Sequence, residues 1–298
     1  MATATGNAAL VDEPTTHRRD AWWVYPTLVV IAYSAFIIYA TFRVLEPTLA
    51  TFWATGAFEP LAASAQFPSY ASYYLADNGV YHYASPFGTP DFTMLVPAFL
   101  YSLHPFVASV VRTPAALILL FPAGFRFTCY YYRKSYYRGF AARPAACAVP
   151  AAKGIDYQGE RKLLVLQNIH RWFLYAAIII TAFLAYDAIR SILTPNGLYF
   201  GLGSALMVVN VGFLMAYTFG CHSFRHLVGG KLDCFSCDGV SSARYSLWTK
   251  VTVLNGRHAV WAWLSLLTVA GTDVYIRYVV MSDPLGIAAA LTHLGVPL

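Results

Sequence analysis

Two cysteines and two histidines of this chain lie at matching depths in four apolar stretches. Each is within roughly one to three helical turns, at about 1.5 Å per residue, of an Arg or Lys that marks the end of its stretch. The four are Cys129, His170, Cys221 and His258. This donor set suits a tetrahedral zinc ion or a Rieske-type [2Fe–2S] centre, in which two histidines replace two cysteines on one iron. The sequence therefore predicts a metal centre at one height.

A structural role is the alternative for each of these side chains. A lone buried cysteine is often a small hydrophobe, and a histidine beside an arginine, as in His170–Arg171, can direct its polar end toward an interface. Cys147, His222 and His226 are alternative ligands. Because His222 and His226 are four residues apart, they share a helix face, and they also suit a haem or a phosphate.

Cys234 and Cys237 form a Cys-x-x-Cys pair further along the chain. With Cys221 and His226 they give the spacing C-x4-H-x7-C-x2-C, a loose match to a zinc ribbon. The competing interpretation is an isolated pair of reduced thiols. All five cysteines fall in segments that we place at or inside the cytoplasmic face, where thiols stay reduced, so we expect no disulfide.

Two aspartates lie deeper along the predicted helices, toward the opposite end. Asp273 has Arg277 four residues on, and Asp187 has Arg190 three residues on. These spacings are typical of structural ion pairs on a helix. An ionisable side chain inside a bilayer is also a functional candidate by default, so the alternative is a proton relay to a quinone.

The composition places these residues in a membrane. The chain of 298 residues is 58% hydrophobic and 11% charged, with a mean hydropathy of +0.52, whereas a soluble domain carries about 25% charged residues. Aromatic residues make up 16%, as expected where Trp and Tyr lie at membrane interfaces. We therefore expect an all-α polytopic membrane protein.

Five stretches are long enough to cross a bilayer core of about 30 Å as helices. They cover residues 23–45, 113–133, 164–191, 200–223 and 257–281. We expect them to form one five-helix bundle, a single transmembrane domain over residues 23–283. A tail at 1–22 precedes this domain and a tail at 284–298 follows it. The expected loops are 46–112, 134–163 and 224–256. Pro97 and Pro105 make 92–107 a re-entrant or interfacial segment rather than a further span.

The basic residues predict the orientation. Sixteen of the twenty Lys and Arg residues lie before the first helix or at the ends and connections of one side. The positive-inside rule places that side, with the N-terminus and the loops 134–163 and 224–256, in the cytoplasm, and the long loop 46–112 outside. Because this distribution accounts for the net charge of +6, we expect no nucleic-acid partner. The basic loops suit a soluble partner with a negative face.

Four strings of residues resemble a known family. They are residues 125–134 (FRFTCYYYRK), 167–171 (QNIHR), 221–226 (CHSFRH) with Gly229-Gly230, and 255–258 (NGRH) followed by WAWLSL at 261–266. Together, over roughly residues 20–285, they resemble the single membrane-anchor subunit of actinobacterial, mycobacterial-type (type-F) succinate dehydrogenase, respiratory complex II.

The resemblance implies a five-helix anchor in the bacterial plasma membrane that docks a flavoprotein and an iron–sulfur protein on its cytoplasmic side. In that family a Rieske-type [2Fe–2S] cluster within the membrane passes electrons to quinone, and succinate is oxidised by the partner subunits. By position, the ligands are Cys129, His170, Cys221 and His258. This sequence departs from the family pattern at Phe224, where a second cysteine is expected, and in having the Cys-x-x-Cys pair. Both departures bear on the ligand set.

A quinone needs an apolar slot with one or two hydrogen-bond donors. Five residues carry suitable polar groups: Tyr130, Tyr131, Asp187, Ser265 and Asp273. Arg126, Arg171 and Arg257 lie near the ligand layer, where they either offset the charge of a cluster or anchor the helices at the positive-inside face. Neutral imidazole ligands would raise the potential of such a cluster above that of an all-thiolate one and favour electron transfer to quinone.

Three other functions fit the same residues. One is a b-type cytochrome anchor, in which His170 pairs with His222, His226 or His258 at a haem; the intramembrane cysteines would then have no role. Another is a metal-handling transporter, which requires a polar path across the bilayer, whereas the outer halves of the first and fourth helices are almost wholly apolar. The third is a structural anchor without a cofactor.

An optical difference spectrum of the purified complex separates the cluster from the haem. We expect the reduced-minus-oxidised spectrum to lack the sharp band of a b-type haem, because His170, which belongs to every haem pair considered, would be committed to iron–sulfur ligation. A b-type band would exclude the cluster.

Overall fold

The structure, a computed structural model, describes residues 18–56, 114–151, 163–194, 197–198 and 200–275. Their regular structure is helical apart from a short hairpin, β1 (Leu193–Thr194) with β2 (Gly197–Leu198), which pair antiparallel. The helices are α1 (Val24–Thr55), α4 (Pro114–Thr128), α5 (Tyr130–Gly139), α6 (Leu163–Arg190), α7 (Leu202–Phe219), α8 (His222–Gly229), α9 (Gly239–Gly256) and α10 (His258–Tyr275). The prediction of an all-α protein is confirmed.

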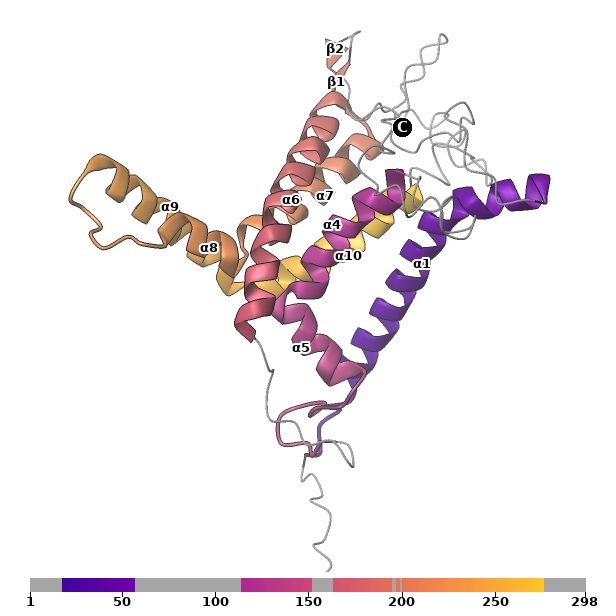
Figure 1. Ribbon diagram of the computed structural model, residues 1–298, viewed down its shortest axis with the longest axis horizontal. Helices are drawn as coiled ribbons and strands as arrows, with labels where there is room; N and C mark the ends of the chain where they lie inside the picture. The colour runs from indigo at the N-terminus through magenta and orange to yellow at the C-terminus, as the bar shows by residue number, and fades with distance from the viewer. Residues whose placement is uncertain (1–17, 57–113, 152–162, 195–196, 199, 276–298) are drawn as a thin grey trace, which may run out of the picture.

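Three of the described helices are long and apolar enough to cross a membrane. They are the Val24–Leu45 part of α1, α6 and α7. α10 packs along α7 and α4 packs along α6, so that both lie inside the same bundle (Figure 1). Over the described residues α4 has 15 residues and α10 has 18, and the count of five spans stays a prediction that depends on these two helices.

The bundle exposes large apolar side chains and buries several polar ones. Large apolar side chains such as Ile31, Ile38 and Leu164 are exposed, which is expected of helices that face lipid rather than water. Polar groups instead turn inward and pair between helices: the Thr268 hydroxyl of α10 donates to the Asn210 Oδ1 of α7 at 3.2 Å. Such pairing replaces the hydrogen bonds that lipid cannot offer.

Two predicted spans are interrupted at their cysteines. The stretch predicted as one helix over 113–133 ends at Thr128 and restarts as α5, with Cys129 extended between them at φ −67° and ψ 129°. The stretch predicted over 200–223 ends at Phe219, and Cys221 precedes α8 with φ −65° and ψ 142°. Apolar content predicted both helical stretches, but it carries no signal for a break whose dihedrals are open to any residue.

Two of the predicted loops are partly helical. α1 continues to Thr55, ten residues into the predicted loop 46–112, and the predicted loop 224–256 is mostly α8 and α9. The re-entrant segment predicted at 92–107 lies outside the described residues. The two tails, 1–22 and 284–298, are described only from residue 18 to residue 22.

α8 and α9 form a helical hairpin that projects from the bundle (Figure 1). Arg244 of α9 holds the end of α8 by donating to the carbonyls of Val228 at 3.0 Å and Gly230 at 2.8 Å. The Arg225 guanidinium stacks over Trp248, with Cζ 4.4 Å from the ring centroid. These contacts come from positively charged side chains that the sequence pattern related only to orientation.

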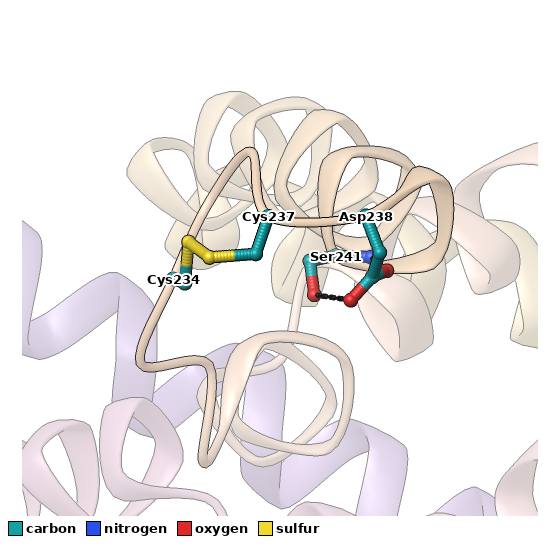
Figure 2. Close-up of a disulfide and its surroundings, with 4 residues drawn as sticks. All are labelled: Cys234, Cys237, Asp238 and Ser241. Carbon is teal, nitrogen blue, oxygen red and sulfur yellow. Dashed lines mark hydrogen bonds between the residues drawn. A yellow bond between two sulfur atoms is a disulfide. The ribbon is translucent and has the colours of Figure 1, made fainter.

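The turn of this hairpin contains a disulfide between Cys234 and Cys237 (Figure 2). The expectation that all cysteines are reduced is therefore wrong for this pair, whose Cα atoms are 5.8 Å apart, within the range that a disulfide requires. Asp238 follows as the N-cap of α9 and accepts hydrogen bonds from the Ser241 backbone N–H and hydroxyl. These hydrogen bonds lower the pKa of the Asp238 carboxyl.

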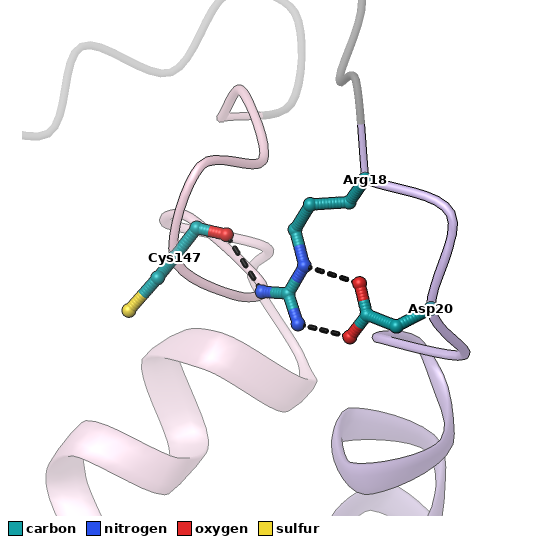
Figure 3. A network of polar contacts seen from close by, with 3 residues as sticks. All are labelled: Arg18, Asp20 and Cys147. Atoms are coloured by element: carbon teal, nitrogen blue, oxygen red, sulfur yellow. Dashed lines mark hydrogen bonds and ion pairs between the residues drawn. The ribbon is translucent and has the colours of Figure 1, made fainter.

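A polar clamp connects the start of α1 to the segment after α5. Arg18 pairs with both carboxylate oxygens of Asp20 and donates to the Cys147 carbonyl at 2.7 Å (Figure 3). The hydrogen bonds of the pair lower the pKa of Asp20 and raise that of Arg18. The clamp uses the backbone of Cys147 and leaves its thiol exposed.

The contact between α4 and α6 depends on a glycine. A Cβ at Gly124 would lie 2.3 Å from the Phe173 ring, whereas a Cβ at Gly271 in α10 meets nothing within 4 Å. We expect Gly124→Ala to destabilise the protein by about 1–3 kcal/mol through overpacking. Gly271→Ala, the matched control, should be neutral or slightly stabilising because alanine favours a helix. Thermal unfolding in detergent measures both, and equal effects would contradict the close contact between α4 and α6.

Candidate metal centre

The four predicted ligands meet in the interior of the bundle as two thiol–imidazole pairs. His170 Nε2 is 3.0 Å from Cys221 Sγ, and His258 Nε2 is 3.7 Å from Cys129 Sγ. Each of the four side chains is 2% exposed. They come from α6, the α7–α8 break, α10 and the α4–α5 break. The site is thus assembled from segments far apart in the chain.

The helix breaks position the two thiols. Cys129 is the N-cap residue of α5 and Cys221 that of α8. The backbone N–H groups of Tyr131 and Tyr132 interact with the Cys129 sulfur, and those of Ser223 and Phe224 with the Cys221 sulfur. A helix N-terminus carries partial positive charge and favours an anion. Each break therefore directs the partial positive charge of a helix start toward a cysteine sulfur, which ligates metal as the thiolate.

His170 is fixed in orientation by two neighbours. Its Nδ1 lies 2.8 Å from the Thr128 hydroxyl, which itself donates to the Gly124 carbonyl at 2.7 Å. With the Thr128 hydrogen committed to that carbonyl, the network assigns the imidazole proton to Nδ1 and leaves Nε2 with a free lone pair toward Cys221. The ring also stacks on Phe125 with centroids 4.5 Å apart. This is the arrangement of a metal-ligating histidine, whose second nitrogen usually has a fixed partner.

His258 is held by ring contacts. It stacks on Tyr217 with centroids 4.9 Å apart, and Tyr131 covers another side at 5.3 Å. Its Nδ1 is buried without a hydrogen-bond partner. An unsatisfied buried polar group costs about 1–3 kcal/mol, and only a partner at Nδ1 itself would offset that cost.

The four donors do not converge on a single point. Over the described ranges, no three His, Cys, Asp or Glu side chains converge on one point that could hold a metal ion, whereas structural zinc requires four ligands and catalytic zinc three. The two thiols also interact electrostatically with each other, as do the two imidazoles. Two thiols and two imidazoles are the donor types of a Rieske-type [2Fe–2S] cluster, and each close contact here joins one thiol to one imidazole.

The other sulfur and imidazole groups lie elsewhere. Cys147 is exposed beside Arg18, and the Cys234–Cys237 pair is bonded to itself, so these two thiols do not form the predicted zinc ribbon with Cys221 and His226. His222 and His226 face each other on α8 with ring centroids 5.2 Å apart.

Phe224 occupies the place where the family pattern led us to expect a second cysteine. Its ring packs against Phe219 at 5.0 Å, and the side chain contacts the hydrophobic core. The position therefore supports α8 against the bundle, and the site is built from Cys221 without a second thiol here.

A cavity of about 310 Å³ lies next to the ligand layer. It is enclosed by α1, α5 and α10, and its lining includes Tyr25, Tyr33, Tyr131, Lys134, Arg138 and Trp263. Of the five residues predicted for a quinone, only Tyr131 lines this cavity, and Tyr131 also contacts the His258 ring. The cavity combines ring faces with hydroxyl and cationic donors.

The remaining quinone candidates lie elsewhere. Tyr130 is exposed, with its ring 6.1 Å from that of Tyr131, and Ser265 is fully buried with its hydroxyl bonded to Arg126 at 3.1 Å. Asp187 is buried near the end of α6, and its Oδ1 has no hydrogen-bond partner. Asp273 accepts a hydrogen bond from Tyr39.

Asp273 lies within an ion pair that reaches another helix. Its Oδ2 is 4.0 Å from the Arg43 Nε of α1, whereas its predicted partner Arg277 lies outside the described residues. The pair therefore connects α10 with α1, a contact that helix spacing alone does not indicate.

Several neighbours of the site were not found by sequence reasoning. Thr128 and Tyr217 contact the ligands but have no motif of their own, because each reaches the site through packing between helices. Arg126 was expected near the ligand layer, with two roles left open, and both it and Arg133 are buried. Their positions beside Cys129 in the sequence were the available signal.

The fold and the site define a helical membrane protein with a buried thiol–imidazole layer. A family model described as actinobacterial succinate dehydrogenase subunit SdhC matches residues 58–282. A solved structure, the Mycobacterium smegmatis Sdh1 complex in the apo form, contains a chain that is 37% identical, with a TM-score of 0.64 over 91% of this chain and 92% of that one. Curated proteins give no match. This chain belongs to the actinobacterial SdhC family, the membrane anchors of succinate dehydrogenase.

Thiol labelling tests the geometry of the site. We expect a membrane-impermeant maleimide to leave Cys129 and Cys221 unmodified in the folded complex, because both sulfurs are buried. Reduction beforehand should add Cys234 and Cys237 to the modified residues, and Cys147→Ser serves as the control for the exposed thiol. Peptide mass spectrometry gives the positions, and rapid labelling of either buried cysteine would contradict the structure.

Proposed function

We propose that this chain receives electrons from an iron–sulfur subunit of succinate dehydrogenase and passes them to quinone. A Rieske-type [2Fe–2S] cluster held by Cys129, His170, Cys221 and His258 would supply one-electron transfer. The observation that supports this most is the meeting of two buried thiols and two buried imidazoles in a bundle that otherwise turns apolar groups outward. Buried polar groups of this kind in a membrane mark functional sites.

The residues around the four ligands keep the site dry and rigid. Phe125, Tyr131 and Tyr217 cover the imidazole rings, and the Thr128 hydroxyl holds His170 in one tautomer. Exclusion of water lowers the local dielectric constant and strengthens electrostatic interactions with nearby charges. A site fixed in this way needs little rearrangement when its charge changes by one electron.

The cavity between α1, α5 and α10 is the proposed quinone site. Tyr131 lines it and contacts the His258 ring, so one aromatic side chain separates the cavity from a proposed ligand. Lys134 and Arg138 lie one turn apart on α5 and bring cationic donors to the same cavity. They are placed to donate hydrogen bonds to the carbonyl oxygens of a quinone as it gains negative charge.

The partner subunits and the orientation in the membrane are both proposed from the end of the bundle at which α1 begins. We propose that the flavoprotein and iron–sulfur subunits dock where α1 begins and α8–α9 projects, which the basic residues place in the cytoplasm of a bacterial plasma membrane. No dicarboxylate site is proposed for this chain, so succinate is assigned to the partners. The bilayer lipids contact the apolar outer faces of α1, α6 and α7.

Electron paramagnetic resonance of the reduced complex tests the proposal. We expect a [2Fe–2S] signal of low average g-value, as imidazole ligation implies, in addition to the signals of the soluble subunits. His170→Ala and His258→Ala should each abolish this signal and quinone reduction, because each removes one iron ligand. Succinate oxidation with a soluble acceptor should continue, since it needs only the partner subunits.

His222→Ala and His226→Ala are the matched controls, because these exposed histidines lie outside the four-residue layer. They should preserve both the signal and quinone reduction. The proposal is wrong if the wild-type complex shows no such signal, or if the signal survives in both His170→Ala and His258→Ala. A b-type haem band in the same sample would replace the cluster with the haem alternative.

A further inference from the structure

Arg126 is buried inside the bundle three residues before Cys129. Its side chain is 9% exposed, whereas Arg171 and Arg257, which the sequence places near the same layer, are exposed. The structure thus separates three arginines that sequence reasoning treated alike. Of the three, only Arg126 directs its charge into the protein rather than toward its surroundings.

The partners of Arg126 are neutral. Its guanidinium donates to the Tyr132 hydroxyl, to the Ala262 carbonyl at 3.2 Å and to the Ser265 hydroxyl at 3.1 Å. It also lies over the rings of Tyr132 and Tyr217, with Cζ 5.5 Å and 4.9 Å from their centroids. These contacts orient the cation and satisfy its donors without neutralising its charge.

Over the described ranges no carboxylate reaches this guanidinium. The ion pairs there join Arg18 to Asp20 and Arg43 to Asp273. An uncompensated buried charge costs several kcal/mol, and the cost is larger where lipid rather than water surrounds the bundle. Retention of Arg126 in this place therefore requires a negative counterpart nearby.

The ligand layer is the group that can provide this counterpart. Tyr217 lies between the guanidinium and the His258 ring, stacked on the imidazole and covered by the arginine. Arg126 interacts electrostatically with Cys129 and with His258. Because cysteine ligates metal as the thiolate, occupation of the site gives Cys129 and Cys221 the negative charge that the arginine lacks.

We infer that Arg126 is the counter-charge of the thiolate-ligated centre and raises its reduction potential, as a positioning residue that touches neither iron nor quinone. The inference rests on the proposed function. Reduction adds one negative charge to a cluster, and a fixed cation in a low-dielectric interior stabilises that reduced form more than the oxidised form. A higher potential makes the centre a better acceptor of electrons from the iron–sulfur subunit.

Arg133 is a second buried cation, and its role differs. It donates to the Thr128 carbonyl across the break at Cys129, so it holds the local backbone as well as bringing charge. The hydrogen bonds of Arg126 go instead to Tyr132, Ala262 and Ser265, and its substitution is therefore the cleaner test of charge. Because Arg133 keeps its charge in an Arg126 variant, we expect the midpoint potential to lose only the contribution of Arg126.

Redox titration of the [2Fe–2S] signal in the complex tests the inference. Arg126→Gln should keep the signal but lower its midpoint potential, and it should slow quinone reduction. Arg126→Lys should titrate close to wild type, because the charge is retained with altered hydrogen bonds. Arg171→Gln is the matched control, since it removes an exposed charge next to ligand His170, and water screens that charge. The signals of the iron–sulfur subunit should titrate unchanged in all three.

Ser265→Ala removes one hydrogen-bond partner of the guanidinium and keeps the charge of Arg126. It therefore separates the effect of charge from that of packing, also if Arg126→Gln fails to assemble. We expect the midpoint potential of the cluster in Ser265→Ala to match wild type. The inference is overturned if Arg126→Gln and wild type have equal potentials, if Arg126→Lys falls as far as Arg126→Gln, or if Ser265→Ala alone reproduces the drop. A wild-type complex without the signal would instead overturn the proposed function, and with it this inference.

Discussion

Lipid offers no hydrogen bonds and no screening, and this constraint organises the whole bundle. Apolar residues such as Ile31 and Leu164 therefore face outward, while Asn210, Thr268 and the four ligands face inward. A soluble protein would reverse this distribution. The buried thiol–imidazole layer is the largest concentration of such polar groups described here, and the packing of α4, α6, α7 and α10 depends on accommodating it.

The helix breaks at Cys129 and Cys221 place the two thiols in this layer. A cysteine in a continuous helix would leave its backbone N–H and those that follow bonded to carbonyls one turn earlier. At a break, the first-turn N–H groups of the next helix are free to face the cysteine. The same geometry occurs twice, at α5 and at α8, and each time the opposing imidazole comes from a helix distant in sequence. Two equivalent helix starts thus present two equivalent thiols to one interior volume.

The basic residues of this chain lie in two settings, and their roles differ. Most basic residues lie at one end of the helices, and several of them, such as Arg244 and Arg225, hold the α8–α9 hairpin through carbonyls and a Trp ring. Arg126 and Arg133 are instead drawn into the interior beside Cys129. Membership in the SdhC family makes this chain a membrane anchor of succinate dehydrogenase. The buried arginines are the feature that connects the electrostatics of the bundle with the chemistry proposed for its centre.

The sequence by itself determined the membrane class, the approximate helical stretches, the family and the four residues that the structure brings together. Those results follow from apolar runs and from local strings around Cys129, His170, Cys221 and His258, which are properties of neighbouring residues. Only the tertiary structure decided that the helices break at the cysteines, that Cys234 and Cys237 are bonded, that Tyr131 rather than Asp187 or Asp273 borders the cavity, and that Arg126 is buried while Arg171 is not. The physical reason is that burial and pairing are set by helices packed from distant parts of the chain, and no local pattern records which neighbour a side chain will meet.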